Sequence, residues 1–151
     1  MTTTRVYIVF HSGRPMDFQT ISEMSGVEPS RITEKGEHRQ NAFRYDLPSS
    51  HGIYVERLFS KLRRTIKNSK QLGEYFKVHG IKVFVEVVIE GITDTYSVPS
   101  IHFDGKFVSF LADLNNAEVD FDIYTDPWEK DDDYYDKPAV VLPSGDSLYK
   151  I

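Results

Sequence analysis

The pattern of apolar and polar positions is most regular between residues 54 and 90, where it predicts a helical region that runs directly into a strand. The apolar residues of the helical part recur at intervals of three and four residues, which is the spacing of one helix face. They are Val55, Leu58, Phe59, Leu62 and Ile66. We expect a joint at Asn68-Ser69, with Ser69 capping a second helical segment. Gly80 is the expected C-terminal stop.

From residue 81 the period of the pattern changes to two, as in a strand with one buried face. The residues of that face are all β-branched, which favours sheet structure. They are Ile81, Val83, Val85, Val87 and Ile89. The opposite face is mixed, because Glu86 and Glu90 share it with Lys82, Phe84 and Val88. We expect these two glutamates to pair with lysine or arginine side chains on neighbouring strands.

The remaining patterns predict four further strands, over residues 5–10, 30–34, 43–47 and 119–124, and two short helices. The first helix is expected to begin after the candidate N-cap Asp17 and to end at Gly26. The second covers residues 107–114 and follows an expected loop at Asp104-Gly105.

This order of elements predicts an α+β fold, a mainly antiparallel sheet with helices on one face. The first six elements match the ferredoxin-like split βαββαβ order, and an additional helix and strand follow. We expect residues 1–126 to form a single α+β domain. After Asp126-Pro127 the composition shifts, so residues 127–151 are predicted to be an acidic C-terminal extension that contains aromatic residues.

Composition excludes several classes of function. The formal net charge of −5 disfavours general binding to nucleic acid and favours a basic partner. The chain has no cysteine, so it has no disulfide framework and no thiolate nucleophile. No apolar run approaches the length of about 18 residues that a membrane span needs. A cytoplasmic location and no contact with membranes are therefore expected, and the oligomeric state is left open.

Two segments resemble a known family. Residues 18–29, FQTISEMSGVEP, are followed by residues 30–37, SRITEKGE, and residues 111–124 place a short helix before the strand VDFDIY. This combination of a helix with a G-hydrophobe-x-P exit, a KGE turn and a D-hydrophobe-D-hydrophobe-Y strand resembles the bacterial domain-of-unknown-function family 4279. The resemblance covers roughly residues 5–125 and leaves the C-terminal extension outside it.

The resemblance implies a fold and no catalytic residues, because the family has no assigned activity. Members with this pattern often carry a tryptophan in the strand after the KGE turn, whereas this chain has Phe43 and Tyr45 there. The single tryptophan, Trp128, belongs to the extension. Some small bacterial proteins of this kind resemble immunity or accessory proteins of toxin gene clusters, and the resemblance suggests that role here.

No motif for catalysis, metal binding or phosphate binding is present in the sequence. The five histidines lack metal-ligand spacing, no glycine-rich phosphate loop occurs, and no cofactor is expected. Asp120 and Asp122 share one strand face and are candidates for cation binding or acid–base chemistry, although the alternation is more typical of a solvated sheet face. A group of basic residues on the long helix is interpreted as a solvated face rather than a nucleic-acid site. It comprises Lys61, Arg63, Arg64, Lys67 and Lys70.

The segment with the strongest functional pattern lies in the extension, where a run of aspartates is flanked by aromatic residues. Charge steers the encounter of two proteins and aromatic side chains supply buried anchors. The residues predicted to bind a partner are Trp128, Glu129, Asp131, Asp132, Asp133, Tyr134, Tyr135 and Asp136. A flexible acidic linker is the competing interpretation.

We therefore expect a non-enzymatic protein-binding module, in its most concrete form an immunity-type protein. Such a protein would neutralise a basic toxin, for which a nuclease is one candidate, by occluding its active site. The alternative is a small-ligand-binding or catalytic domain with a pocket between sheet and helices, and with His11, His102 or Asp122 at its rim. A third hypothesis is a structural module that self-associates through the sheet edge or the tail.

Overall fold

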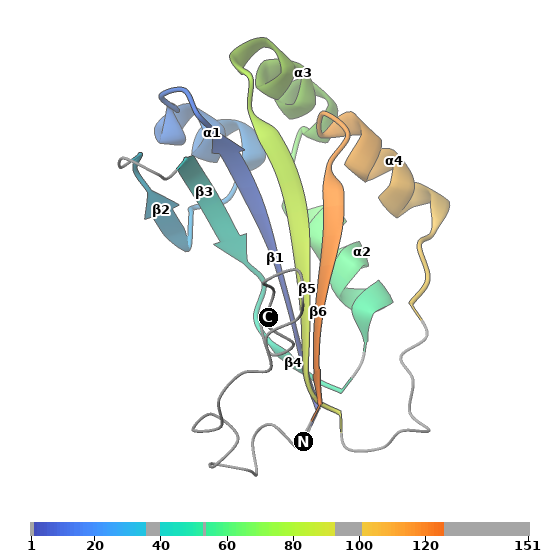
Figure 1. Cartoon of the computed structure of the whole chain (residues 1–151). Helices are drawn as coiled ribbons and strands as arrows, with labels where there is room; N and C mark the ends of the chain where they lie inside the picture. Colours follow the sequence, from blue (N-terminus) through green and yellow to red (C-terminus); the bar gives the residue numbers. More distant parts are fainter. Residues whose placement is uncertain (1, 36–39, 53, 93–100, 126–151) are drawn as a thin grey trace, which may run out of the picture.

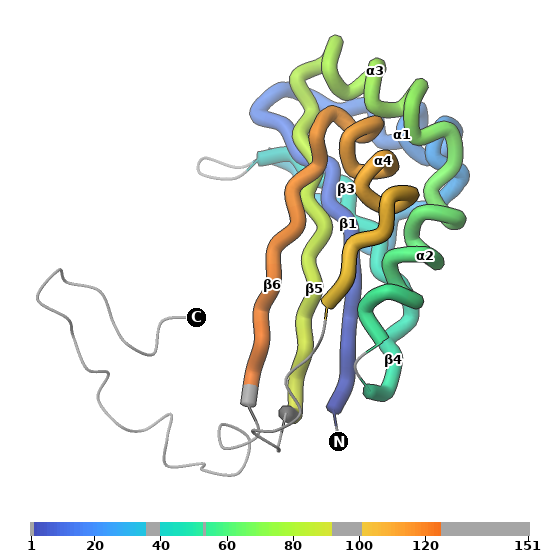
Figure 2. Tube along the Cα trace, turned by 90° about the vertical axis from the view of Figure 1, so that its right-hand side faces the viewer, coloured from blue at the N-terminus to red at the C-terminus, as the bar shows by residue number. Residues whose placement is uncertain are grey.

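A six-stranded sheet forms the centre of the protein, and the helices pack against one of its faces (Figures 1 and 2). The computed structural model describes residues 2–35, 40–52, 54–92 and 101–125. Within these residues there are four helices and six strands, so the α+β class with helices on one face is confirmed. We call the opposite face, against which none of these four helices packs, the helix-free face.

The long first strand organises the sheet. β1 (Thr3–Ser12) runs antiparallel to β3 (Asn41–Asp46) on one side and to β5 (Lys82–Ile92) on the other. β2 (Arg31–Thr33) extends the sheet beyond β3. At the opposite edge β6 (Glu118–Thr125) pairs with β5 in parallel, after the crossover through a helix that parallel neighbours need. The resulting order is β2-β3-β1-β5-β6.

The predicted ferredoxin-like order is not confirmed. That arrangement joins parallel neighbouring strands through helical crossovers, whereas β1 is antiparallel to both β3 and β5. The structure also adds a two-residue strand, β4 (Ser50–His51), which pairs with the beginning of β1. This strand was not predicted, because residues 48–52 contain proline, glycine and serine and have the composition of a turn.

Capping chemistry accounts for both ends of the first helix and for the C-terminal end of the third. α1 (Phe18–Ser25) is capped by Asp17, whose carboxylate accepts a hydrogen bond from the Thr20 backbone N–H at 3.1 Å. Its C-terminal Gly26 is left-handed, and so is Gly80 after α3 (Ser69–His79). The joint between α2 (Val55–Thr65) and α3 is confirmed, but Asn68 is the N-cap and Ser69 is already helical.

The start of α4 (Gly105–Asp113) differs from the prediction. The expected loop at Asp104-Gly105 is instead the beginning of this helix, because the Asp104 carboxylate accepts a hydrogen bond from the Phe107 N–H at 2.7 Å. The helix ends before Asn115 and Asn116, both of which have positive φ angles. Asparagine tolerates this conformation better than other residues that carry a Cβ.

The core lies between the sheet and the helices. The alternating β-branched residues of β5 and the predicted stripe of α2 are all buried there, as expected. Phe59 of α2 stacks on Phe107 of α4 with ring centroids 4.1 Å apart, and this contact joins the two helices. Among the described residues, no helix has both the length and the apolar character that crossing a bilayer requires.

Candidate functional site

The helix-free face of the sheet carries the densest group of ionisable side chains. One row across four strands contains Asp46 of β3, Tyr7 of β1, Glu86 of β5 and Asp120 of β6. Asp122 lies one step further along β6, opposite Val88. Because side chains alternate between faces, the strand pattern that sends Val83, Val85 and Val87 into the core sends Glu86 to this face.

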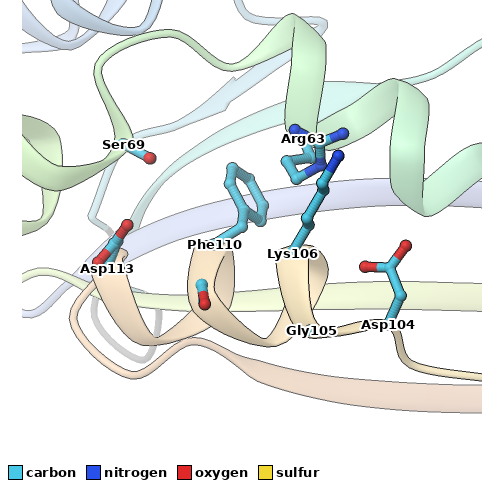
Figure 3. A pocket seen from close by; sticks show the side chains of 8 residues that line it. Arg63, Ser69, Asp104, Gly105, Lys106, Phe110 and Asp113 are labelled. Atoms are coloured by element: carbon cyan, nitrogen blue, oxygen red, sulfur yellow. The ribbon is translucent and has the colours of Figure 1, made fainter.

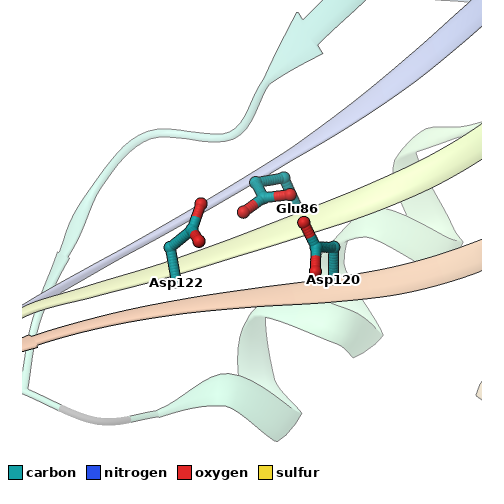
Figure 4. Close-up of side chains that lie close together, drawn as sticks. All are labelled: Glu86, Asp120 and Asp122. Atoms are coloured by element: carbon teal, nitrogen blue, oxygen red, sulfur yellow. The ribbon is translucent and has the colours of Figure 1, made fainter. Parts of the chain in front are cut away.

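Three carboxylates converge on this face over β5 and β6. Glu86, Asp120 and Asp122 each offer an oxygen, and these oxygens lie within 4.8 Å of one another. Figure 4 shows the side chains pointing toward a common region above β5 and β6. We call these three residues the carboxylate cluster.

Glu86 is the buried member of the cluster. Its side chain is only 3% exposed, whereas Asp122 is half-buried and Asp120 is exposed. Its neighbours on this face include Val9 and Val88, both of which are buried. The Oε1 atom of Glu86 has no hydrogen-bond partner among the described residues. A buried acceptor without a partner is costly, so the position is not explained by stability.

Burial and negative neighbours change the protonation of Glu86. Removal from water is the largest cause, and hydrogen bonding and charge repulsion from Asp122 and Asp120 add to it; together they raise the pKa of Glu86 from 4.5 to about 8. At neutral pH Glu86 therefore holds a proton. Burial, followed by the charge of Glu86, also raises the pKa of Tyr7, which lies opposite it on β1.

The basic residues of this face contact other groups. Arg5 pairs with Glu90 at 2.5 Å, and Arg44 pairs with Asp46 at 2.6 Å. The Arg44 guanidinium also lies 3.7 Å from the centre of the Tyr7 ring. Within the described part of the chain, no lysine or arginine nitrogen lies within 4.0 Å of the carboxylate cluster.

The pairing with basic residues that was predicted for the two glutamates of β5 holds for only one of them. The expected cross-strand pairing is confirmed for Glu90, which contacts Arg5. It is wrong for Glu86, because the side chains beside it are Tyr7 on β1 and Asp120 on β6 rather than basic residues. Glu86 was not predicted as a site residue. One signal in the sequence could have indicated its role. Glu86 is an acidic residue in the middle of a predicted strand, and the positions on both sides of it are apolar.

A second feature is an open groove between α2 and α4, with a volume of about 820 Å³ (Figure 3). Basic Arg63 and Lys106 line it together with acidic Asp104 and Asp113, so the lining does not select a ligand by charge. Asp104 already caps α4.

The three residues predicted for the rim of a pocket are not brought together. The His11 ring contacts Gln40 and packs edge-on against Phe84. The backbone N–H of His102 instead donates to Glu56 of α2. Asp122 belongs to the carboxylate cluster on the helix-free face.

The basic group on α2 and α3 agrees with the solvated-face interpretation. Arg63 is half-buried, and the other four residues of the group are exposed. Arg64 and Lys67 donate hydrogen bonds to backbone carbonyls of their own segment, at Ser60 and Arg64 respectively. These local contacts give no indication of a nucleic-acid surface.

The residues predicted to bind a partner all lie outside the described residues. This applies to the whole set: Trp128, Glu129, Asp131, Asp132, Asp133, Tyr134, Tyr135 and Asp136. Their role stays a prediction, as does the separation of residues 127–151 from the domain.

Fold and site together define an α+β protein with one helix-covered sheet face and one helix-free face that bears buried and exposed acids. The family model described as "Domain of unknown function (DUF4279)" matches residues 2–126. The chain therefore belongs to this family, as the resemblance of its two segments predicted. No curated protein and no solved structure matches the chain.

Proposed function

We propose that the protein is a non-enzymatic binding module that engages a basic protein through the helix-free face of its sheet. The observation that carries this proposal is the carboxylate cluster, which faces away from the helices and has no basic partner within ion-pair distance among the described residues. A lysine or arginine of another protein would complement it.

The charge of the face and its tyrosine side chains both support this use. Like-signed charges in one place raise the rate of encounter with an oppositely charged partner. The face also carries Tyr7 and Tyr124, which are half-buried, and tyrosine is enriched at protein interfaces because its ring is apolar and its hydroxyl is polar. Exposed Asp120 provides the first contact for an approaching cation.

The specific form we favour is an immunity-type protein that neutralises a basic toxin. A net charge of −5 on 151 residues supports a basic partner, and an acidic surface is suited to an active site that binds phosphate. A nuclease toxin is one such partner. We place the protein in the cytoplasm, because a chain without cysteine needs no oxidising compartment.

Capture of partners from the native host, followed by binding kinetics with the purified partner, tests the proposal. The test variant is D120K/D122K, and the matched control is E28K/E74K, which makes the same charge change at exposed positions after α1 and on α3. We expect the test variant to associate at least tenfold more slowly and with weaker salt dependence, and the control to retain most of the association rate. Equal rates for the two variants would refute the proposal.

A separate variant tests the C-terminal segment. Charge reversal of Asp131, Asp132 and Asp133 tests whether the acidic extension contributes to the same encounter. A slower association with weaker salt dependence would support the prediction from the sequence. Unchanged kinetics in this variant, with a loss in D120K/D122K, would assign binding to the sheet face alone.

A further inference from the structure

We propose that Glu86, Asp120 and Asp122 form a binding site for a hard divalent cation, with Ca²⁺ preferred over Mg²⁺. This inference goes beyond the proposed function, because it concerns the isolated protein and holds whatever macromolecule the face contacts.

The donor set has the chemistry that such cations select. Carboxylate oxygens are the preferred ligands of Ca²⁺ and Mg²⁺, and the cluster supplies oxygens from three separate side chains on two adjacent strands. Its members are held by the pairing of β5 with β6, in which Glu86 lies opposite Asp120 and Val88 opposite Asp122. Rigid strands fix the spacing of the ligands better than a loop does.

The spacing favours the larger ion. Two oxygens bound to Ca²⁺ at about 2.3–2.6 Å can lie up to about 5 Å apart on opposite sides of the ion. The oxygens of the cluster all lie within 4.8 Å of one another, so one Ca²⁺ can bind all three. Mg²⁺, with bonds of about 2.0–2.1 Å, allows only about 4 Å and demands regular octahedral geometry. Oxygens more than about 4 Å apart would have to move closer together before Mg²⁺ could bind them all, so the site suits Ca²⁺ better.

Glu86 provides evidence that is independent of the acidic cluster as such. Its side chain is 97% removed from solvent, it points into the cluster, and its Oε1 has no hydrogen-bond partner among the described residues. A buried acceptor without a partner costs free energy. Coordination of a cation by the ionised carboxylate would satisfy this acceptor, and at neutral pH it would release the Glu86 proton to solvent. The basic residues of the same face do not fill this role, since Arg5 and Arg44 pair with Glu90 and Asp46.

Solvent reaches the carboxylate cluster from the side of β6, so a cation can enter there. Asp120 is exposed and Asp122 is half-buried, so an ion reaches the cluster over β6, which is the edge strand. Ca²⁺ takes about six to eight oxygen ligands, and water on this open side would complete its coordination. A site that is open on one side and has three protein ligands predicts weak affinity, with a Kd on the order of 10⁻⁴ M.

Titration calorimetry of the chelator-treated, full-length protein at constant ionic strength tests the proposal. CaCl₂ and MgCl₂ are the probes, and D120N is compared with E118Q, because both remove one negative charge from the same face of β6. We expect saturable Ca²⁺ binding that is at least fivefold tighter than Mg²⁺ binding. D120N should weaken Ca²⁺ binding at least tenfold, whereas E118Q should weaken it less than threefold. E86Q, which keeps the shape of the buried side chain, should weaken binding as D120N does.

Several results would overturn the assignment. They are the absence of saturable Ca²⁺ binding by the wild-type protein, a Ca²⁺ affinity no greater than that for Mg²⁺, and equal effects of D120N and E118Q. The last result would indicate diffuse attraction of cations to an acidic face. The wild-type titration is decisive even if a variant does not fold. It contains no protein partner, so its failure leaves the proposed protein binding standing.

Discussion

Glu86 on β5 lies directly opposite Asp120 on β6 in the parallel pairing of these two strands. This single register position brings a buried carboxylate beside an exposed one and places Asp122 within reach of both. A shift of one residue would send the acids of β6 to the core face and its apolar residues outward. Packing of the half-buried Val119 and Phe121 against the core therefore also maintains the carboxylate cluster.

The buried carboxyl group makes stability depend on pH in a defined direction. The pKa of Glu86 is about 8 in the folded protein, above the ordinary value of 4.5. Between these values the folded protein keeps a proton that the unfolded chain has lost, so the free energy of unfolding falls as pH rises. We expect a loss of a few kcal/mol that begins above about pH 4.5 and is complete above about pH 8, measured by urea unfolding with a chelator present.

E86Q is the control for this pH dependence, because glutamine has the shape of the protonated acid and does not titrate. The stability difference between E86Q and the wild type should grow in favour of E86Q from pH 5 to pH 9, while contributions of other titrating groups cancel. Parallel profiles for the two proteins would show that Glu86 does not hold its proton near neutrality.

Close packing of α3 on the end of α4 makes Gly73 irreplaceable. A Cβ atom at this position would lie 1.6 Å from the backbone oxygen of Asp113, and backbone cannot move aside as a flexible side chain can. We expect G73A to lower the free energy of unfolding by about 3 kcal/mol, measured by urea denaturation. G105A is the matched control at the start of α4, where a Cβ meets nothing within 4 Å, and it should be neutral or slightly stabilising. Similar losses in the two variants would contradict this account of the packing.

The Asp104 cap explains why α4 begins where it does. Its carboxylate accepts a hydrogen bond from the Phe107 N–H, and the helix that it starts buries Phe107 and Phe110. We expect D104A to cost about 1 kcal/mol in thermal or urea unfolding, and D104N to cost little, since asparagine is an equally good N-cap. A large loss in D104N would indicate that the charge, not the hydrogen bond, is needed.

Local signals predicted most of the fold. The alternation at residues 81–90 specified both the strand and its buried face, and Asp17 with Gly26 marked the two ends of α1. These features depend on the nearest neighbours in the chain, which the sequence displays directly. The two-residue strand β4 was missed because its pairing with β1 is not a local property.

The candidate site was only half predictable for the same reason. Alternation placed Asp120 and Asp122 on the same face of their strand, and it placed Glu86 on the mixed face of its own strand. It did not show that these two strands are neighbours. Which strands are neighbours, and in which register, depends on the crossover through α4 that makes β5 and β6 parallel. Without that pairing, a basic partner was the natural expectation for Glu86, as it was for Glu90.

If both proposals hold, Ca²⁺ and the basic partner compete for the same carboxylates. A bound divalent cation would cancel most of the local negative charge and occupy the position of a partner's lysine or arginine. We expect saturating Ca²⁺ to slow association with the purified partner at least threefold more than NaCl of equal ionic strength does. In D120N this excess effect should disappear, since the variant has lost a ligand, while it should persist in E118Q. Equal slowing by CaCl₂ and NaCl in the wild type would show that partner and cation use different parts of the face.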